Sequence, residues 1–154
     1  MKGRFKQGER VMGESTPMGR FSVDVVIANN RDVLMAKPGD RIPDCVKHLQ
    51  LKGLVDSGAA RLVLPQRVVT ELQLTDEGET TVRYADHRRE KRRLVSNVWL
   101  QLLGRHSIFS AVIEPEREDA LIGAIVLEEL DLLVDCGTQS VYPREPDAIV
   151  TEIE

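Results

Sequence analysis

The segment LKGLVDSGAARLVLP, residues 51–65, places one acidic residue between two apolar runs. Leu54 and Val55 precede Asp56, small residues follow it, and a second apolar run begins at Leu62. Each apolar run predicts a buried strand. Asp-Ser-Gly predicts a tight turn, because an Asp side chain caps the backbone two residues on. Such turns are common, but apolar segments on both sides make Asp56 a candidate catalytic carboxylate.

The rest of the chain predicts a mainly β domain, because short runs of Val, Ile, Leu and Thr alternate with turn residues. We expect roughly seven to nine strands and one or two short helices. Residues 20–28 predict a strand, Asn29–Asn30 a tight hairpin, and residues 33–36 the returning strand. Residues 80–103 predict a long hairpin with a charged tip, HRREKR, at residues 87–92.

Two short segments have the apolar spacing of helices. Pro65 is suited to opening a helical turn, and three apolar residues after it share one face: Val68, Val69 and Leu72. Residues 121–135 begin with a second helical pattern and end in a strand at Asp135. This second segment also creates a near-repeat, because LVDCG at 133–137 resembles LVDSG at 54–58.

Composition limits the class of protein. The chain has 154 residues and a net charge of −4, which favours one domain and argues against a nucleic-acid-binding surface. Cys45 and Cys136 have no metal-ligand spacing, and the three histidines are dispersed, so we expect no metal and no cofactor. The polar N-terminus predicts a cytoplasmic protein without a membrane segment. We expect a flexible leader over 1–19, a domain over 20–145 and a tail over 146–154.

Three motifs together resemble one family. They are LVDSGAARLVLP at 54–65, YADHR at 84–88 and ALIGAIVLEELDLLVD at 120–135. In this order they resemble the retroviral-type, or retropepsin-like, aspartic peptidases and their single-domain bacterial relatives, over about residues 20–143. The resemblance implies a mainly β, closed β-barrel-like domain with one short C-terminal helix, active as a two-fold dimer.

The resemblance also assigns roles to residues. Asp56 would be catalytic, and the active-site turn would continue through Ser57, Gly58 and Ala59. The Ser57 hydroxyl would tie the turns of two subunits together. A supporting motif would consist of Leu121, Ile122 and Gly123. The flap over the substrate would be the hairpin at 80–95, with substrate-binding residues Tyr84, Ala85, Asp86, His87 and Arg88.

Two positions depart from the family pattern. Ala60 stands where relatives often carry Asp, Thr or Ser, and His87 replaces a glycine expected at the flap tip. Five cations follow the tip: Arg88, Arg89, Lys91, Arg92 and Arg93. They are either a solvated hairpin end or a cationic flap that attracts acidic peptides.

The resemblance implies an aspartic endopeptidase that binds a peptide or protein substrate. One Asp-Ser-Gly supplies one carboxylate, so a homodimer would supply the pair that this chemistry needs. Asp135 is a poor second half-site within the chain, since few residues follow it and Cys136 lacks a hydroxyl; we interpret it as a strand-to-turn residue. The alternative function is a non-catalytic dimerisation or peptide-binding module on the same fold.

Overall fold

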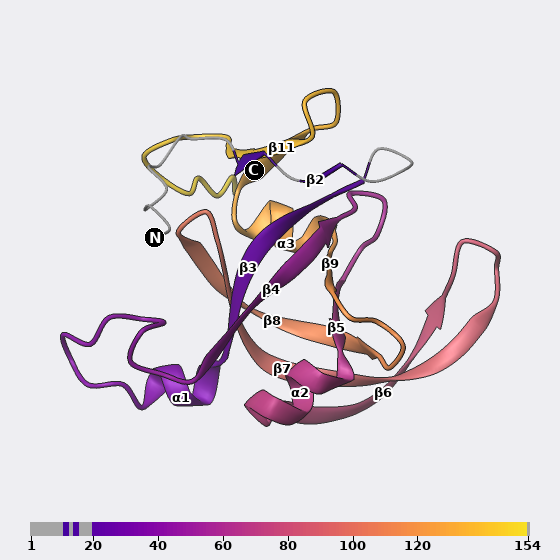
Figure 1. Cartoon of the computed structure of the whole chain (residues 1–154), viewed down its shortest axis with the longest axis horizontal. Helices are drawn as coiled ribbons and strands as arrows, with labels where there is room; N and C mark the ends of the chain where they lie inside the picture. The colour runs from indigo at the N-terminus through magenta and orange to yellow at the C-terminus, as the bar shows by residue number, and fades with distance from the viewer. Residues whose placement is uncertain (1–10, 13, 16–19, 154) are drawn as a thin grey trace.

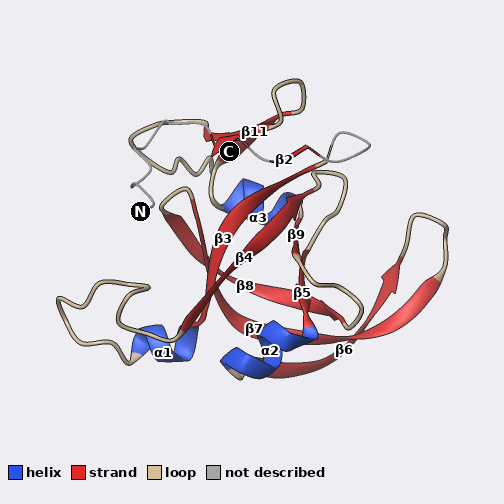
Figure 2. Ribbon diagram, viewed as in Figure 1, coloured by secondary structure: helices blue, strands red, loops and turns tan. Residues whose placement is uncertain are grey.

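Strands dominate the chain, as Figures 1 and 2 show. The computed structural model describes residues 11–12, 14–15 and 20–153. The elements are β1 (Val11–Met12), β2 (Glu14–Ser15), β3 (Phe21–Asn29), α1 (Asn30–Leu34), β4 (His48–Val55), β5 (Leu62–Pro65), α2 (Gln66–Leu72), β6 (Thr75–Arg83), β7 (Arg89–Leu102), β8 (Arg105–Glu114), β9 (Ala120–Ile122), α3 (Ala124–Glu129), β10 (Leu132–Asp135) and β11 (Ser140–Pro143).

Six strands close into a barrel in the order β3, β4, β9, β5, β8 and β7. The ring closes because β3 pairs with β4 along one edge and with β7 along the other. Apolar side chains from every part of this ring fill the interior, including Phe21, Ile27, Leu62, Leu100 and Ile122. Full closure leaves no unpaired edge within the ring. The predicted mainly β, closed-barrel architecture is confirmed.

Strand β9 lies between β4 and β5, the two strands that flank Asp56 (Figure 1). Leu121 pairs in parallel with Leu54 of β4 and in antiparallel with Val63 of β5. Two motifs that are far apart in the sequence are therefore adjacent in the sheet. This arrangement determines the geometry of the candidate site.

The predicted hairpin at Asn29–Asn30 is wrong. Asn29 ends β3 and caps α1, because its Oδ1 accepts a hydrogen bond of 2.9 Å from the Arg31 backbone N–H. Its Nδ2 donates to the carbonyl oxygen of Leu72 at 3.0 Å, which anchors the helix to the core. The next strand along the chain that pairs with β3 is β4, after a long loop, whereas Leu34 and Met35 are 74% and 83% exposed.

The described residues form more elements than predicted, eleven strands and three helices. The additional elements are mostly very short, such as β1 and β2, which pair with β11 and β3. Most of the predicted leader lies outside the described residues, and the domain boundaries stay predictions. No helix in the described part of the chain has the length and apolar character to span a membrane.

The segment after β11 is attached to the barrel by polar contacts. Arg105 is buried and donates hydrogen bonds to the carbonyl oxygens of Leu130, Glu145 and Ala148. Asp131 accepts from Arg144 at 2.7 Å and from the Val150 backbone N–H at 3.1 Å. The hydrogen bond from Arg144 is the main cause of a lowered pKa for Asp131.

Candidate active site

Asp56 follows directly on β4 and begins a tight turn. Its backbone N–H donates to the carbonyl oxygen of Ile122 at 3.1 Å, which continues the pairing of β4 with β9. Its Oδ1 accepts a hydrogen bond of 3.0 Å from the Gly58 N–H, as the Asp-Ser-Gly sequence predicts. The side chain is 24% exposed. The turn therefore holds one carboxylate oxygen and leaves the group open to a ligand.

Gly123 lies against the backbone of this turn. A Cβ at this position would lie 2.3 Å from the carbonyl oxygen of Arg61 and 2.8 Å from that of Ala59. Since these are backbone atoms, no side chain fits without displacing the turn. The N–H groups that follow Gly123 bond the same segment, from Ala124 to Ala59 O at 2.7 Å and from Ile125 to Ala60 O at 3.1 Å. The start of α3 thus braces the turn.

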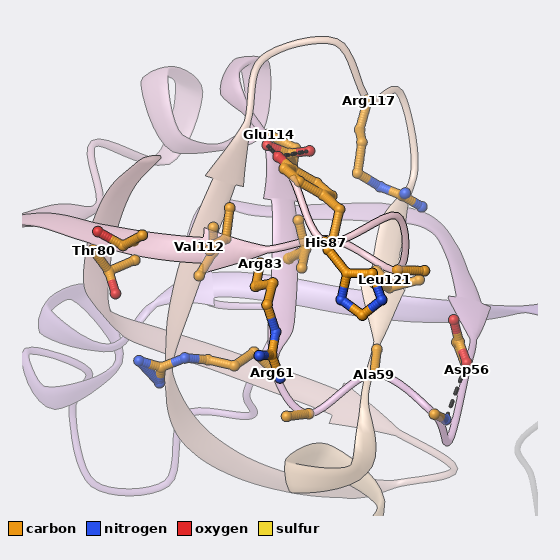
Figure 3. Close-up of a pocket in the computed structure, with 17 residues that line it drawn as sticks. Asp56, Ala59, Arg61, Thr80, Arg83, His87, Val112, Glu114, Arg117 and Leu121 are labelled. Carbon is orange, nitrogen blue, oxygen red and sulfur yellow. Dashed lines mark hydrogen bonds between the residues drawn. The ribbon is translucent and has the colours of Figure 1, made fainter. Parts of the chain in front are cut away.

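A cavity of about 770 Å³ opens between this turn and the hairpin of β6 and β7 (Figure 3). Its lining includes seven of the residues expected at the site, namely Asp56, Gly58, Ala59, Tyr84, Ala85, His87 and Leu121. Ala60 also lines it. The turn and the predicted flap are therefore two walls of one cavity.

The other expected residues lie beside the cavity. Ser57 is exposed at the turn, and its hydroxyl has no hydrogen-bond partner among the described residues. Ile122 is fully buried in the core behind the turn, next to the bracing Gly123. Asp86 and Arg88 are exposed in the hairpin turn, where Asp86 Oδ1 accepts from the Arg88 N–H at 3.0 Å.

The flap turn runs from Tyr84 to Arg88. The His87 N–H donates to Tyr84 O at 2.9 Å, and the Tyr84 N–H donates to Arg88 O at the same distance. His87 has a φ of 68°, so this position does adopt the left-handed conformation that favours glycine. The hairpin is as predicted, but its turn is shorter. Of the cations expected at the tip, Arg88 lies in the turn and the others lie on β7.

A carboxylate that the sequence reasoning missed anchors the flap. Glu114 ends β8, and both of its carboxylate oxygens accept from the Tyr84 hydroxyl, at 2.8 and 2.9 Å. Arg92 pairs with the same carboxylate. Burial, followed by the hydrogen bond to Glu114, raises the pKa of Tyr84. The same glutamate raises the pKa of Arg92 through its hydrogen bond. Glu114 precedes the loop at 115–119, and nothing in the sequence distinguishes it from an ordinary surface charge.

Two of the five cations in the predicted cluster are paired with carboxylates. Arg92 is paired with Glu114, and Arg93 is paired with Asp76. Three other arginines line the cavity instead, Arg61, Arg83 and Arg117. Arg61 lies between the Asp56 turn and β5, and Arg83 is the last residue of β6. Isolated arginines at strand ends resemble ordinary surface residues, so the sequence alone did not identify them.

One further charged group lies near Asp56, and Asp135 lies elsewhere. Arg20 precedes β3, and its Nε lies 3.7 Å from Asp56 Oδ2. Because the Arg20 side chain is 46% exposed, this ion pair is weak. Asp135 ends β10, as expected for a strand-to-turn residue, and does not line the cavity.

Comparisons with known proteins identify the fold. No model of a protein family matches this chain, and no curated protein matches it. A solved structure that does match is that of EIAV protease complexed with the inhibitor HBY-793, with a TM-score of 0.52 and 17% sequence identity. The match covers 76% of this chain and 93% of that protein. The chain therefore has a retropepsin-like fold.

Proposed function

We propose that the chain is an aspartic endopeptidase that acts as a homodimer. The observation that carries the proposal is the position of Asp56, which lies on a braced turn in the wall of a cavity covered by a hairpin. A peptide in extended conformation would lie between the turn and the flap. The fold likeness to a retroviral protease supports this assignment.

The chemistry requires two carboxylates that share one proton. One acts as general base toward a water molecule, and the other acts as general acid toward the oxygen of the scissile amide. The water oxygen forms a bond to the amide carbon, one water proton passes to the base, and the acid protonates the amide oxygen, which gives a diol. The first carboxyl group then gives its proton to the nitrogen, a diol hydroxyl gives its proton to the other carboxylate, and the C–N bond breaks to release a carboxylic acid and an amine. One chain contributes Asp56, so the second carboxylate is Asp56 of a second copy across a two-fold axis.

Features around the turn are consistent with such a dimer. Ser57 is exposed with its hydroxyl available, so it is suited to bond the turn of the second copy. Ile125, whose N–H bonds the turn, is 44% exposed and places an apolar side chain near the same surface. A two-fold interface brings each of these groups close to its counterpart.

Replacing Asp56 tests both the chemistry and the sharing of the site. Asp56→Asn keeps the oxygen that accepts from Gly58 but removes the charge, so hydrolysis of a mixed peptide library should fall by at least about 10³-fold. In subunit exchange, a tenfold excess of Asp56→Asn chains should reduce the activity per wild-type chain to about a tenth, because most wild-type chains then lie in mixed dimers.

Asp135→Asn is the matched control and should neither abolish hydrolysis nor inhibit the wild type. Full activity of Asp56→Asn would exclude the proposed chemistry. Constant activity per wild-type chain, when a tagged pull-down shows that subunits exchange, would exclude the shared site. Peptide binding without hydrolysis by the wild type would instead identify a peptide-binding module.

A further inference from the structure

The charges on the cavity wall are not balanced locally. The lining contains two carboxylates, Asp56 and Glu114, and each already has a cation nearby, Arg20 and Arg92 respectively. Arg61 and Arg83 have no ion-pair partner among the described residues. These two guanidinium groups thus have neither an ion-pair partner nor a hydrogen-bond acceptor within the described part of the chain.

We propose that these two arginines select substrates with an acidic side chain in the segment that occupies the cavity. The inference rests on the proposed peptidase function and names the substrate class of that same site. Guanidinium groups bind carboxylates through pairs of parallel hydrogen bonds, which gives them both strength and orientation. A glutamate or aspartate of the substrate would be the anion that the cavity lacks.

The two arginines come from opposite walls. Arg61 belongs to the segment that leaves the Asp56 turn, and Arg83 belongs to the flap, from which it points toward the Arg61 side of the cavity (Figure 3). A substrate carboxylate between them would connect the flap to the turn. Acidic substrates would therefore be held at the site and would also favour a closed flap.

The flap sequence adds an independent indication. Arg83 pairs directly with Arg89 across the hairpin, so two like charges face each other next to the turn. Directly opposed like charges destabilise a strand pair. Glu114 does not relieve this repulsion, because it is bonded to Arg92 and Tyr84. A bound anion beside Arg83 would offset it.

Arg117 has a different role at the edge of the cavity. Its Nε donates to the carbonyl oxygen of Asp119 at 3.1 Å, which ties the side chain to its own loop. His87 also reaches into the cavity from the flap turn (Figure 3). Arg117 adds to the positive field that an acidic substrate would enter, whereas Asp56 opposes it.

The test uses peptide libraries that differ at one fixed position, which is Glu, Gln or Lys. When the fixed position is the one that binds the two arginines, the wild type should cleave the Glu library with a kcat/KM about tenfold higher than that for the Gln library. This ratio is expected for charge-assisted hydrogen bonds in a partly open site. The Arg61→Gln/Arg83→Gln protein should bring this ratio close to one. Arg61→Glu/Arg83→Glu should reverse the preference toward Lys.

The control variant is Arg31→Gln/Arg41→Gln, which removes the same net charge. Arg31 lies on α1 and Arg41 in the loop after it, on the opposite side of the molecule from the flap hairpin (Figure 1). It should retain the wild-type ratio of Glu to Gln cleavage. A wild-type ratio near one, or a high ratio that survives in Arg61→Gln/Arg83→Gln, would overturn the inference while leaving the peptidase proposal intact.

A binding measurement separates the two proposals. If no library is cleaved, the peptidase proposal fails, and fluorescence anisotropy with the same fixed-position peptides then decides the inference. Tighter binding of Glu than of Gln peptides, lost in Arg61→Gln/Arg83→Gln, would support the acidic specificity. Equal binding of both would overturn it.

Discussion

The chain contains the same short motif twice, and the two copies differ in what surrounds them. In LVDSG the Gly58 N–H donates to Asp56 Oδ1 at 3.0 Å, and in LVDCG the Gly137 N–H donates to Asp135 Oδ1 at 2.9 Å. A Cβ on either glycine would lie 3.3 Å from that oxygen. Local sequence therefore produces the same local turn in both places.

The chain returns differently after each turn. Asp135 ends β10, and the chain folds straight back into β11, where Ser140 pairs with Asp135. After Asp56 the chain enters β5, which does not pair with β4, because β9 lies between them. The first turn is thus held by a segment from far along the chain, and the second is held by its own hairpin. The comparison teaches that a remote brace, and not the motif, places a carboxylate in a cavity.

The largest expected effect comes from removing that brace. Gly123→Ala places a Cβ within 2.3 Å of backbone at the Asp56 turn, so the turn has to move. The free energy of unfolding should fall by about 3 kcal/mol, the upper range for overpacking, and hydrolysis should be lost. Urea unfolding and peptide cleavage measure the two effects.

Gly137→Ala is the control for Gly123→Ala. Its Cβ meets a side-chain oxygen at a surface hairpin, which can adjust, so stability should change by less than about 1 kcal/mol. Equal destabilisation by both substitutions would show that the two turns are held in the same way.

Exchanging the middle residues of the turns tests the proposed dimer. Ser57→Cys converts the first turn to the sequence of the second and removes the hydroxyl proposed to bond the second copy. The dissociation constant of the dimer should rise by about tenfold, since neutral hydrogen bonds contribute about 1 kcal/mol each. Sedimentation equilibrium measures this constant. Cys136→Ser makes the reverse exchange at β10–β11 and should leave it unchanged; an equal response of both variants would contradict the assignment of Ser57 to the interface.

Removing the hydrogen bond that anchors the flap, from Tyr84 to Glu114, is expected to have a smaller effect. The Asp135 turn has no counterpart to this anchor in the described part of the chain. Tyr84→Phe removes the hydroxyl that donates to Glu114, so the flap loses one attachment to β8. Stability should fall by about 1 kcal/mol, and KM should rise severalfold with a smaller change in kcat. A change confined to kcat would indicate that Tyr84 takes part in the chemistry instead of positioning the flap. Steady-state kinetics with one peptide distinguishes these outcomes.

The smallest expected effect is a difference in pH dependence at the open end of the β10–β11 hairpin, opposite to the second turn. The pKa of Asp131 is lowered from its ordinary value of 3.8, mainly by the hydrogen bond from Arg144 and then by that from Val150. A carboxyl group whose pKa is lowered in the folded protein stabilises the fold at pH values above its ordinary pKa. This stabilisation is lost as the pH falls through the lowered pKa of the folded protein. Stability should therefore decrease more steeply on acidification below about pH 5 in the wild type than in Asp131→Asn.

Arg144→Gln removes the main partner of Asp131 and should flatten the same pH dependence. Urea midpoints at a series of pH values measure it for all three proteins. If the wild type and both variants lose stability in parallel, the Asp131–Arg144 pair does not control acid sensitivity in this half of the molecule.

Much of the fold could be predicted because the strands are short, alternating and separated by turn residues. The mainly β class, the hairpin of β6 and β7, and the helix after Pro65 follow from these local patterns, whereas the closed barrel was implied by the resemblance of three motifs to retropepsin-like peptidases. The prediction of a hairpin at Asn29–Asn30 was wrong, because an asparagine caps a helix as readily as it forms a turn between two strands. Which of the two forms depends here on the contact of Asn29 with Leu72, which the local sequence does not encode.

The candidate site likewise has parts that could be predicted from the sequence and parts that could not. The turn at Asp56 and the hairpin that covers it were predictable, since each is a continuous segment with its own signature. Glu114, Arg61 and Arg83 were not, because their importance arises where separate segments meet in the fold. A charged residue at a strand end has the same sequence signature whether it faces a cavity or bulk water.

The insertion of β9 between β4 and β5 also affects when the site can form during synthesis. Residues 54–65 leave the ribosome well before residues 120–124, and chains are made from the N-terminus. Until the later segment arrives, neither the pairing of Leu121 nor the contact of Gly123 exists, so the Asp56 turn is unsupported. Contacts between distant segments also form slowly, because a long loop must first be closed. A growing chain would thus carry the Asp-Ser-Gly sequence without its brace, and the proposed activity would arise only after the barrel closes.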